Sequence, residues 1–173
     1  MKKIFITGIS ETGKTTISEE LRNRGFHAIS IDETKGLCSW RNRETNERVV
    51  GEVDLNKDFT DNHRWICDVE QLKELMKVEF EIIFVLGMAS NQDEVSVLFD
   101  KVLILQCEPK IFIERLNTRT NNTFGKDPSI QNHMLEWYQD FENELLSKGA
   151  VSINTNRPIG EVVDEVIKQA ILQ

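Results

Sequence analysis

Eight residues near the start of the chain, Gly8–Thr15, place the strongest constraint on its fold, because they read G-x-x-x-x-G-K-T. The apolar run Ile4–Ile6 precedes them, and an amphipathic stretch begins at Thr16. This order of strand, loop and helix is the context in which the pattern binds phosphate. Its glycines let successive backbone N–H groups converge on a phosphate, and the helix N-terminus adds partial positive charge. The sequence therefore predicts that the chain binds a nucleoside triphosphate.

Individual positions of this loop have distinct expected roles. Lys14 would reach the β- and γ-phosphates, and the hydroxyl of Thr15 would hold Mg²⁺. Glu11 is unusual, because it places an anion close to the bound phosphates, at a cost that is small only if its side chain points outward. The candidate nucleotide-binding residues of the loop are Gly8, Ser10, Glu11, Thr12, Gly13, Lys14, Thr15 and Thr16.

Length and charge narrow the class of protein. A chain of 173 residues is long enough for one well-buried domain, so we expect a single domain over residues 1–173. Its formal charge of −8 argues against nonspecific nucleic-acid binding. The longest apolar run, Ile82–Leu86, is too short to span a bilayer, and the short apolar run after Lys3 does not resemble a signal peptide. We expect a cytoplasmic monomer or homodimer that binds neither nucleic acid nor membrane.

Apolar runs alternate with helical patterns along the chain, in the order typical of an α/β protein. Strands are predicted over residues 3–7, 26–31, 81–86, 101–107 and 150–153, and helices over residues 14–24, 109–118, 131–147 and 160–172. The continuous apolar core of residues 81–86 indicates a strand that is buried on both faces. The pattern predicts a five-stranded parallel sheet with helices on both faces.

Two polar segments interrupt this rhythm. Residues 33–66 show little strand or helix periodicity, and residues 118–130 have the composition of a loop. Long irregular segments inside compact domains are usually lids or binding loops. We therefore expect both segments to serve function.

Missing motifs disfavour two kinds of phosphate-loop protein. Guanine-specific proteins use N-K-x-D, and the nearest approach, Asn56–Phe59, has the wrong spacing. Motor and transport ATPases usually end a strand in an aspartate that holds Mg²⁺, whereas the strand over residues 81–86 is followed by Gly87. A carboxylate follows the strand over residues 26–31 instead, at Asp32. In a parallel sheet, that strand end faces the phosphate loop.

Three features together resemble the small nucleotide-kinase-like P-loop enzymes, which include adenylate, shikimate, gluconate and small nucleoside kinases. These features are the loop at residues 8–16, Asp32 after the second strand, and the segment Glu114-Arg115-Leu116-x-x-Arg119 before a loop. The resemblance covers nearly the whole chain in the order of its elements. It implies a three-layer P-loop NTPase fold, with an acceptor-binding segment over residues 33–68 and a lid over residues 117–130.

The resemblance also implies residue roles. Arg115 and Arg119 would be lid arginines that neutralise the transferring phosphoryl group, and their i, i+4 spacing puts both on one helical face. Asp32 would accept the acceptor's proton or order a magnesium-bound water, and Arg157 would stack on the adenine ring. The implied reaction is Mg²⁺-dependent transfer of the γ-phosphoryl group of ATP to a nucleoside, a nucleotide or a similar small molecule.

Simpler interpretations of these residues stay open. Asp32 is also a common type of helix cap or turn residue, and Arg115 would serve equally as a surface partner of Glu114. Gly87 matches a position where such kinases let substrate approach the backbone, and it also suits an ordinary turn.

The acceptor is open as well. The motif D-G-F-P-R of adenylate kinases and the glycine triplet of shikimate kinase are both absent after the third strand. Arg41, Arg43 and Arg64 would suit a phosphate or carboxylate, whereas Trp40 or Trp65 would suit a base or a sugar. The alternatives are a shikimate- or gluconate-like sugar-acid kinase, and a nucleotide-binding regulator or slow ATPase that has no acceptor.

Overall fold

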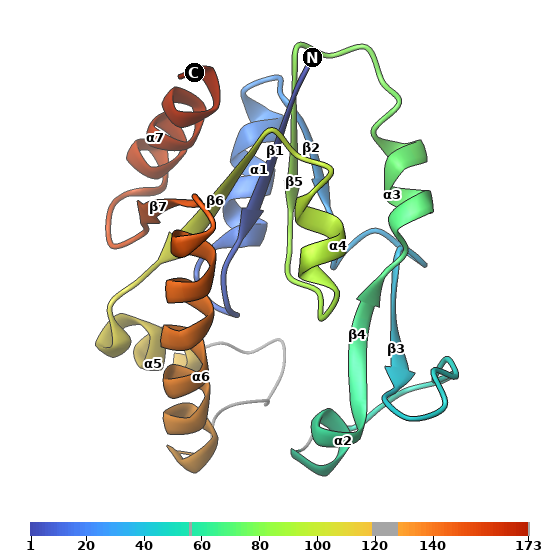
Figure 1. The fold of residues 1–173 in the computed structure, drawn as a ribbon. Helices are drawn as coiled ribbons and strands as arrows, with labels where there is room; N and C mark the ends of the chain where they lie inside the picture. Colours follow the sequence, from blue (N-terminus) through green and yellow to red (C-terminus); the bar gives the residue numbers. More distant parts are fainter. Residues whose placement is uncertain (56, 119–127, 173) are drawn as a thin grey trace.

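A five-stranded parallel sheet forms the centre of the molecule in the computed structural model, which describes residues 1–55, 57–118 and 128–172 (Figure 1). The strand order is β2-β5-β1-β6-β7, so β1, which leads into the phosphate loop, lies in the middle. The strands are β1 (Lys2–Thr7), β2 (His27–Ser30), β5 (Ile82–Leu86), β6 (Lys101–Gln106) and β7 (Val151–Asn154). The predicted sheet is therefore confirmed, with strand ends that differ from the prediction by one residue at most.

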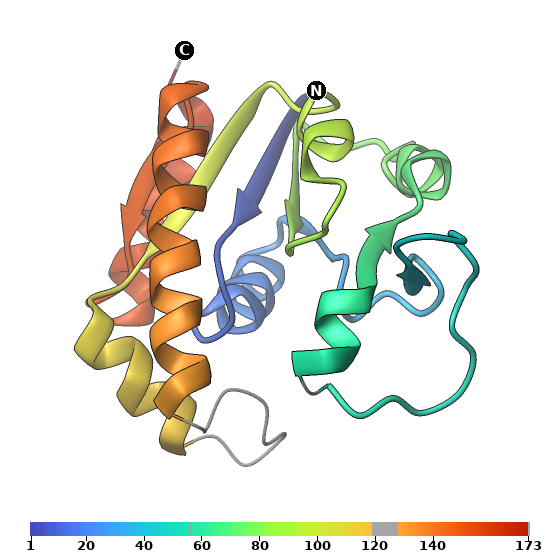
Figure 2. The same cartoon turned by 60° about the horizontal axis from the view of Figure 1, so that its bottom comes forward.

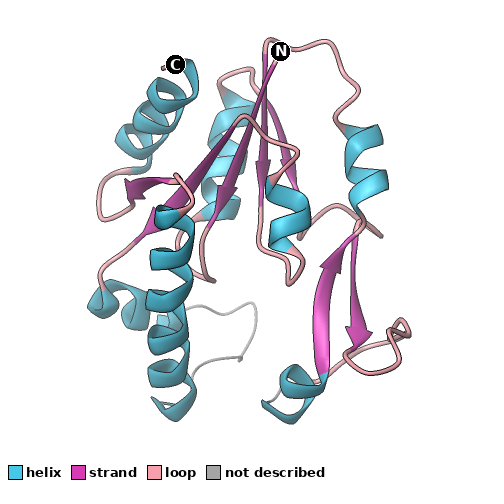
Figure 3. Ribbon diagram, in the orientation of Figure 1, coloured by secondary structure: helices cyan, strands magenta, loops and turns pink. Residues whose placement is uncertain are grey.

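Helices cover both faces of this sheet and make three layers (Figure 3). On one face, Ile4 and Ile6 pack against α1 (Lys14–Asn23) and α7 (Ile159–Ile171). On the other face, Phe5 belongs to a cluster with residues of α3 (Val69–Leu75) and α4 (Gln92–Ser96). Alternate residues of β1 thus enter two separate cores, as the pleat of a strand requires. The predicted three-layer α/β fold is confirmed.

Two further helices pack beside β6 and complete the core. These are α5 (Pro109–Thr118) and α6 (Pro128–Ser147), joined by a cluster that includes Phe112, Leu116 and Tyr138. The hydroxyl of Tyr138 donates a hydrogen bond to the carbonyl oxygen of Leu105 in β6. This bond fixes α6 relative to the sheet.

The predicted lid over residues 117–130 is only partly a loop. Residues 117–118 end α5, and residues 128–130 open α6, which begins three residues before the predicted start at residue 131. Pro128 suits that place, because proline is well tolerated in the first turn of a helix. The rest of the predicted lid, residues 119–127, lies outside the described residues.

The prediction that residues 33–66 lack regular structure is wrong. The predicted acceptor-binding segment, residues 33–68, contains an antiparallel pair of strands, β3 (Cys38–Asn42) and β4 (His63–Cys67). The short helix α2 (Lys57–Asn62) lies between these strands in the chain, directly before β4. The strands of this hairpin are five residues each and separated by a long connection, so neither carries a clear pattern of its own. The register places Trp40 opposite Trp65 and Arg41 opposite Arg64.

The hairpin is attached to the rest of the molecule through β4 and the segment after β5. The backbone N–H of Ser90 donates to the carbonyl of Trp65 at 2.7 Å, and the Asn91 side chain bonds both backbone groups of Cys67 at 2.9 and 3.0 Å. The hairpin and α6 extend beyond the carboxyl edge of the sheet on two sides (Figures 1 and 2). That edge is where parallel α/β sheets bind their ligands.

No helix within the described ranges is long and apolar enough to cross a membrane.

Candidate active site

The phosphate loop joins β1 to α1 at the carboxyl edge of the sheet and is held close to β6. Gly8 is buried there with φ of 155°. A Cβ atom on Gly8 would lie 2.8 Å from Thr12 Oγ1 and 3.0 Å from the carbonyl oxygen of Leu105, so only glycine fits. The Thr12 hydroxyl in turn donates to the carbonyl of Ile9 at 2.7 Å. The shape of the loop is therefore fixed by its own residues.

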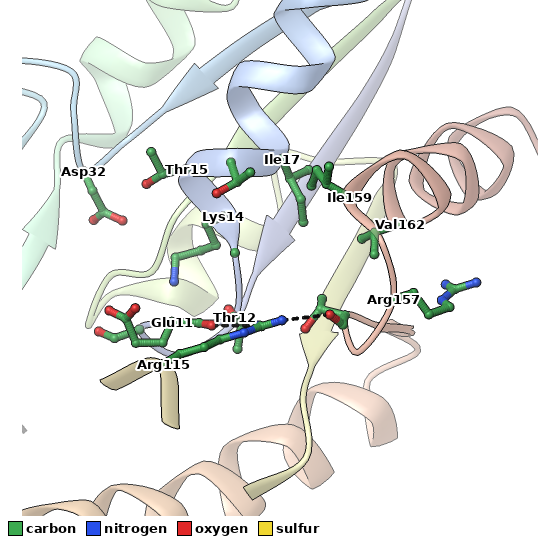
Figure 4. Close-up of a pocket in the computed structure, with 14 residues that line it drawn as sticks. Glu11, Thr12, Lys14, Thr15, Ile17, Asp32, Arg115, Arg157, Ile159 and Val162 are labelled. Atoms are coloured by element: carbon green, nitrogen blue, oxygen red, sulfur yellow. Dashed lines mark hydrogen bonds between the residues drawn. The ribbon is translucent and has the colours of Figure 1, made fainter. Parts of the chain in front are cut away.

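A cavity of about 700 Å³ lies against this loop, and we call it the P-loop cavity (Figure 4). It is lined by Ser10, Glu11, Thr12, Gly13, Lys14, Thr15, Thr16, Ile17, Asp32, Arg115, Thr155, Arg157, Ile159 and Val162. The structure thus brings together all the predicted nucleotide-binding residues except Gly8, which does not line the cavity. The volume is that of an ordinary small-molecule site.

Lys14 is the central cation of the P-loop cavity. Its ammonium donates to the carbonyl oxygens of Gly8 at 2.6 Å and Ile9 at 2.8 Å. Burial lowers the pKa of Lys14 to about 8, and the carboxylates of Asp32 and Glu11 act in the opposite direction. A buried cation beside the loop favours an anionic ligand, because the anion would restore the charged form of the lysine.

Asp32 and Thr15 face the same cavity from different elements: Asp32 follows β2, and Thr15 lies in the first turn of α1 (Figure 4). The indole N–H of Trp65 donates to Asp32 Oδ1 at 3.2 Å. Loss of water around the carboxyl group raises the pKa of Asp32, while Lys14 and Trp65 lower it. A helix cap or a turn would join Asp32 to its neighbours in the sequence. Lys14 and Trp65 come from distant parts of the chain, so neither of these simpler roles accounts for them.

Glu11 lines the P-loop cavity, so its side chain does not point outward as the low-cost alternative required. Its φ is 64°, a left-handed conformation that non-glycine residues rarely adopt. The negative charge of Glu11 acts on Lys14 within the same cavity. That Glu11 weakens the binding of an anion at this place stays a prediction.

Arg115 lies at the junction of three segments. Its guanidinium donates to the carbonyl of Glu11 and to the carbonyl of Thr155, each at 3.0 Å (Figure 4). It is half-buried in the wall of the P-loop cavity and holds the loop against the segment after β7. A surface pair with Glu114 is not what the structure shows. The role of Arg115 toward phosphate stays a prediction.

The other two predicted arginines differ from Arg115. Arg119 lies outside the described residues. Arg157 is exposed and lines the far end of the P-loop cavity, where its guanidinium points away from Lys14 (Figure 4). The position agrees with a contact to the base end of a nucleotide.

A second cavity, of about 730 Å³, adjoins the first, and we call it the tryptophan cavity. It is lined by Ser10, Lys14, Asp32, Trp40, Leu55, Trp65, Met88, Ala89, Ser90, Gln92, Asp93, Trp137, Phe141, Glu144 and Leu145. The two cavities share Ser10, Lys14 and Asp32. A molecule in each would therefore meet the other at these three side chains.

The hairpin presents its tryptophans and its arginines to opposite sides. Trp40 and Trp65 line the tryptophan cavity with ring centroids 5.3 Å apart. Because side chains alternate along a strand, Arg41 and Arg64, each one residue away and in register with each other, lie on the other face. Arg41 donates there to the carbonyl of Asn46 at 3.2 Å. Neither Arg41, Arg43 nor Arg64 lines the tryptophan cavity, and their contact with a phosphate or carboxylate stays a prediction.

Gly87 serves packing. A Cβ atom at this position would lie 2.0 Å from Cγ1 of Ile31 and 3.3 Å from Asp32 Oδ2. With φ of 153° and no side chain, Gly87 lets the segment around Ile31 and Asp32 approach β5. The space above Gly87 is filled by Ile31, and Gly87 does not line the tryptophan cavity.

Ten of the fifteen described residues that line the tryptophan cavity are ones that the sequence did not single out as functional. Trp137 and Phe141 come from α6, and Gln92, Asp93 and Met88 come from the segment after β5. The helical rhythm of α6 predicted only a core-facing role for Phe141. The one sequence signal for a role in a binding site was Trp137, a large aromatic residue that does not follow the core-facing helical spacing.

The phosphate loop, the strand order and the two adjoining cavities define a P-loop NTPase of the nucleotide-kinase-like group. A model of a protein family described as "AAA domain" matches residues 4–136, so the chain belongs to this family.

Similar proteins support this class. The chain is 27% identical to the "Putative adenylate kinase" of Methanocaldococcus jannaschii, over 96% of this chain and 84% of that protein. Its fold is similar to that of shikimate kinase from Bacteroides thetaiotaomicron, with a TM-score of 0.61, 15% identity and 99% of each chain covered. It is also similar to deoxyadenosine kinase from M. mycoides, with a TM-score of 0.58, 14% identity, and 96% of this chain and 97% of that chain covered.

Proposed function

We propose that this protein is an ATP-dependent kinase that transfers the γ-phosphoryl group of ATP to a small molecule. The observation that carries the proposal is the meeting of two cavities at Ser10, Lys14 and Asp32. A phosphoryl transferase needs a donor site and an acceptor site that adjoin where the phosphoryl group passes between them. A protein that only bound or slowly hydrolysed ATP would not need the second cavity.

The reaction follows from this arrangement. The acceptor oxygen attacks the γ-phosphorus of ATP, a bond from that oxygen to phosphorus forms, and the bond to the β,γ-bridging oxygen breaks. Asp32 stands at the junction, where its carboxylate would take the proton of an acceptor hydroxyl. The products are ADP and a phosphorylated acceptor.

Cationic groups of the P-loop cavity would stabilise the charge of the transferring group. Lys14 would exchange its bonds to the carbonyls of Gly8 and Ile9 for bonds to the phosphates. Arg115 would act from the wall of the cavity, beside Glu11. Burial strengthens these interactions, because the effective dielectric constant is lower than in water.

The side chains present also fit a magnesium ion. Thr15 supplies a hydroxyl and Asp32 a carboxylate to the same cavity, and Mg²⁺ prefers one or two such oxygens together with substrate phosphates. Burial raises the pKa of Asp32 although Lys14 and Trp65 lower it, and a bound cation would favour the charged carboxylate further. When bound, Mg²⁺ would neutralise charge on the phosphates.

Residues 33–68 are proposed as the acceptor-binding segment. Trp40, Leu55 and Trp65 of this segment line the tryptophan cavity. The names of the similar proteins support a kinase but differ in the acceptor, since they include adenylate, shikimate and deoxyadenosine kinases.

Transfer of a radioactive label tests the proposal. The full chain is incubated with γ-labelled ATP, Mg²⁺ and pools of nucleosides, nucleotides and sugar acids, and products are separated by chromatography. We expect a labelled small molecule in at least one pool. In Lys14→Ala the labelled product should fall by about a thousandfold or more, because the cation that meets the transferring group is gone.

Lys77→Ala is the matched control. Lys77 is an exposed lysine after α3 that pairs with Glu74 at 2.6 Å and lines neither cavity. It should behave as the unaltered protein. Tight ATP binding with slow hydrolysis and no labelled product in any pool would reject the kinase and favour the slow ATPase.

A further inference from the structure

We propose that the acceptor is an uncharged molecule with a flat aromatic ring and a free hydroxyl group, as in a nucleoside, and not a phosphate- or carboxylate-bearing molecule. This inference rests on the kinase function proposed above and concerns what fills the tryptophan cavity.

Aromatic side chains form two walls of the tryptophan cavity. Trp40 and Trp65 come from the hairpin, whereas Trp137 and Phe141 come from α6 and stack on each other with centroids 5.2 Å apart. Figure 2 shows the hairpin and α6 on two sides of the carboxyl edge of the sheet. The chain has three tryptophans, and all of them line this one cavity. Aromatic walls of this kind favour a flat ring between them.

The charges of the cavity disfavour an anionic acceptor. Among the described residues that line it, Lys14 is the only cation, and Lys14 is shared with the P-loop cavity. Arg41 and Arg64 lie on the other face of the hairpin. A phosphate or carboxylate on the acceptor would thus lie near Asp32 with no cation of its own among the residues that the structure describes, and binding a desolvated anion without a partner is costly.

The two other acids of the cavity do not create a site for a cation either. Lys148 pairs with Asp93 at 2.8 Å and with Glu144 at 2.7 Å. The single ammonium offsets one of the two negative charges, so this rim keeps a net negative charge, which disfavours an anionic acceptor. Because both carboxylates already bond Lys148, the interior is suited to a neutral ligand.

Gln92 supplies a hydrogen-bonding group inside the cavity. The side chain is only 7% exposed, and its Oε1 accepts a bond from the Thr7 hydroxyl at 3.3 Å. Its Nε2 is buried and has no hydrogen-bond partner among the described residues. Buried polar groups are nearly always satisfied, so this N–H group, in a side chain that lines the cavity, is available to an acceptor atom of a ligand, such as a ring nitrogen or a carbonyl.

Matched acceptor pairs test the inference. The full chain is assayed with γ-labelled ATP and Mg²⁺ against adenosine, cytidine, guanosine and thymidine, each beside its own 5′-monophosphate, and against gluconate and shikimate. We expect at least one nucleoside to exceed its monophosphate and both sugar acids by about a hundredfold or more in kcat/KM, the loss expected when a desolvated charge lacks a partner.

The possible failures are distinguishable. A labelled product formed preferentially from a monophosphate or a sugar acid would overturn the inference and leave the kinase function standing. No labelled product from any acceptor would reject the kinase function, and the inference with it.

Two substitutions test the aromatic wall at Trp40 and the side-chain amide of Gln92 separately. Trp40→Leu should raise KM for the preferred nucleoside by about tenfold, with the affinity for ATP unchanged, because one stacking surface is lost. Gln92→Met should lower kcat/KM for that nucleoside by about tenfold and change the ranking of the bases, since a donor to the ring is lost. Phe80→Leu is the control, because Phe80 stacks on His27 and lines neither cavity. An unchanged KM in Trp40→Leu and an unchanged ranking in Gln92→Met would contradict the inference.

Discussion

The two cavities that meet at Asp32 are built in different ways. The P-loop cavity takes most of its lining from one continuous stretch, residues 10–17. The tryptophan cavity takes its lining from the hairpin, from the segment after β5 and from α6, which are far apart in the sequence. The first is polar and holds most of the charged residues to which we assign catalytic roles, whereas the second is largely aromatic. Under the proposed function, donor binding is thus a local property of the chain, while acceptor choice depends on the tertiary fold.

A substitution of Asp32, which lines both cavities, gives the largest expected effect on phosphoryl transfer with little effect on ATP binding. Asp32→Asn keeps a partner for the indole N–H of Trp65 but removes the carboxylate. We expect phosphoryl transfer to fall by about a hundred- to a thousandfold, because proton acceptance and charge at the junction are lost. ATP affinity, measured by calorimetry without Mg²⁺, should change little. Unchanged turnover would remove Asp32 from the reaction and separate the two cavities functionally.

The protonation of Lys14 tests the donor side alone. Its pKa of about 8 lies below the ordinary value for lysine, so the ammonium loses its proton as pH rises through 8 in the free protein. ATP affinity should weaken about tenfold between pH 7.5 and pH 9, as the charged fraction of Lys14 falls. Calorimetric titrations across this range measure the effect. Lys14→Met should abolish that dependence; if it does not, another group is responsible.

Trp65 tests the link between the cavities. In Trp65→Phe the hydrogen bond to Asp32 Oδ1 is lost, and since that bond lowers the pKa of Asp32, the pKa should rise further. The acidic limb of the profile of kcat against pH should therefore move to higher pH. Trp137→Phe is the matched variant, because Trp137 lines the cavity without a bond to Asp32. An equal displacement of the limb in both variants would argue against the link.

Glu11 gives the smallest expected effect. Glu11→Gln removes a negative charge from the P-loop cavity and should tighten ATP binding by about threefold, most clearly at low salt, where screening is weakest. Glu19→Gln, at an exposed position of α1 that lines neither cavity, should show no such gain. Weaker binding in Glu11→Gln would mean that the carboxylate holds the loop in shape.

The donor side could be predicted from the sequence for the same reason that it is local. The motif in residues 8–15 combines composition, spacing and flanking periodicity, and the apolar strands around it carry strong signals of their own. Asp32 was identified because it follows a strand whose end faces the loop. The sheet, its order of elements and most of the P-loop cavity were therefore predictable.

The acceptor side was not predictable, because its signals are short or depend on pairing. The strands β3 and β4 pair across a long connection, and the face on which Trp40 lies follows only from their register. The helices α3 and α4 have seven and five residues, too few for a clear period. Trp137 lines the same cavity as Trp40 only because α6 packs against β6. Residue type alone could not show that Arg41 and Arg64 would lie on the face of the hairpin opposite Trp40 and Trp65.

The central claim is that ATP and a neutral aromatic acceptor lie in adjoining cavities and meet at Lys14 and Asp32. A crystal structure of the full chain with a non-hydrolysable ATP analogue, Mg²⁺ and the preferred nucleoside tests it most directly. We predict the γ-phosphate beside Lys14, the nucleoside ring between Trp40 and Trp137, and the acceptor hydroxyl within hydrogen-bonding distance of Asp32. A nucleoside bound only in the P-loop cavity, or with its hydroxyl away from Asp32, would contradict the account.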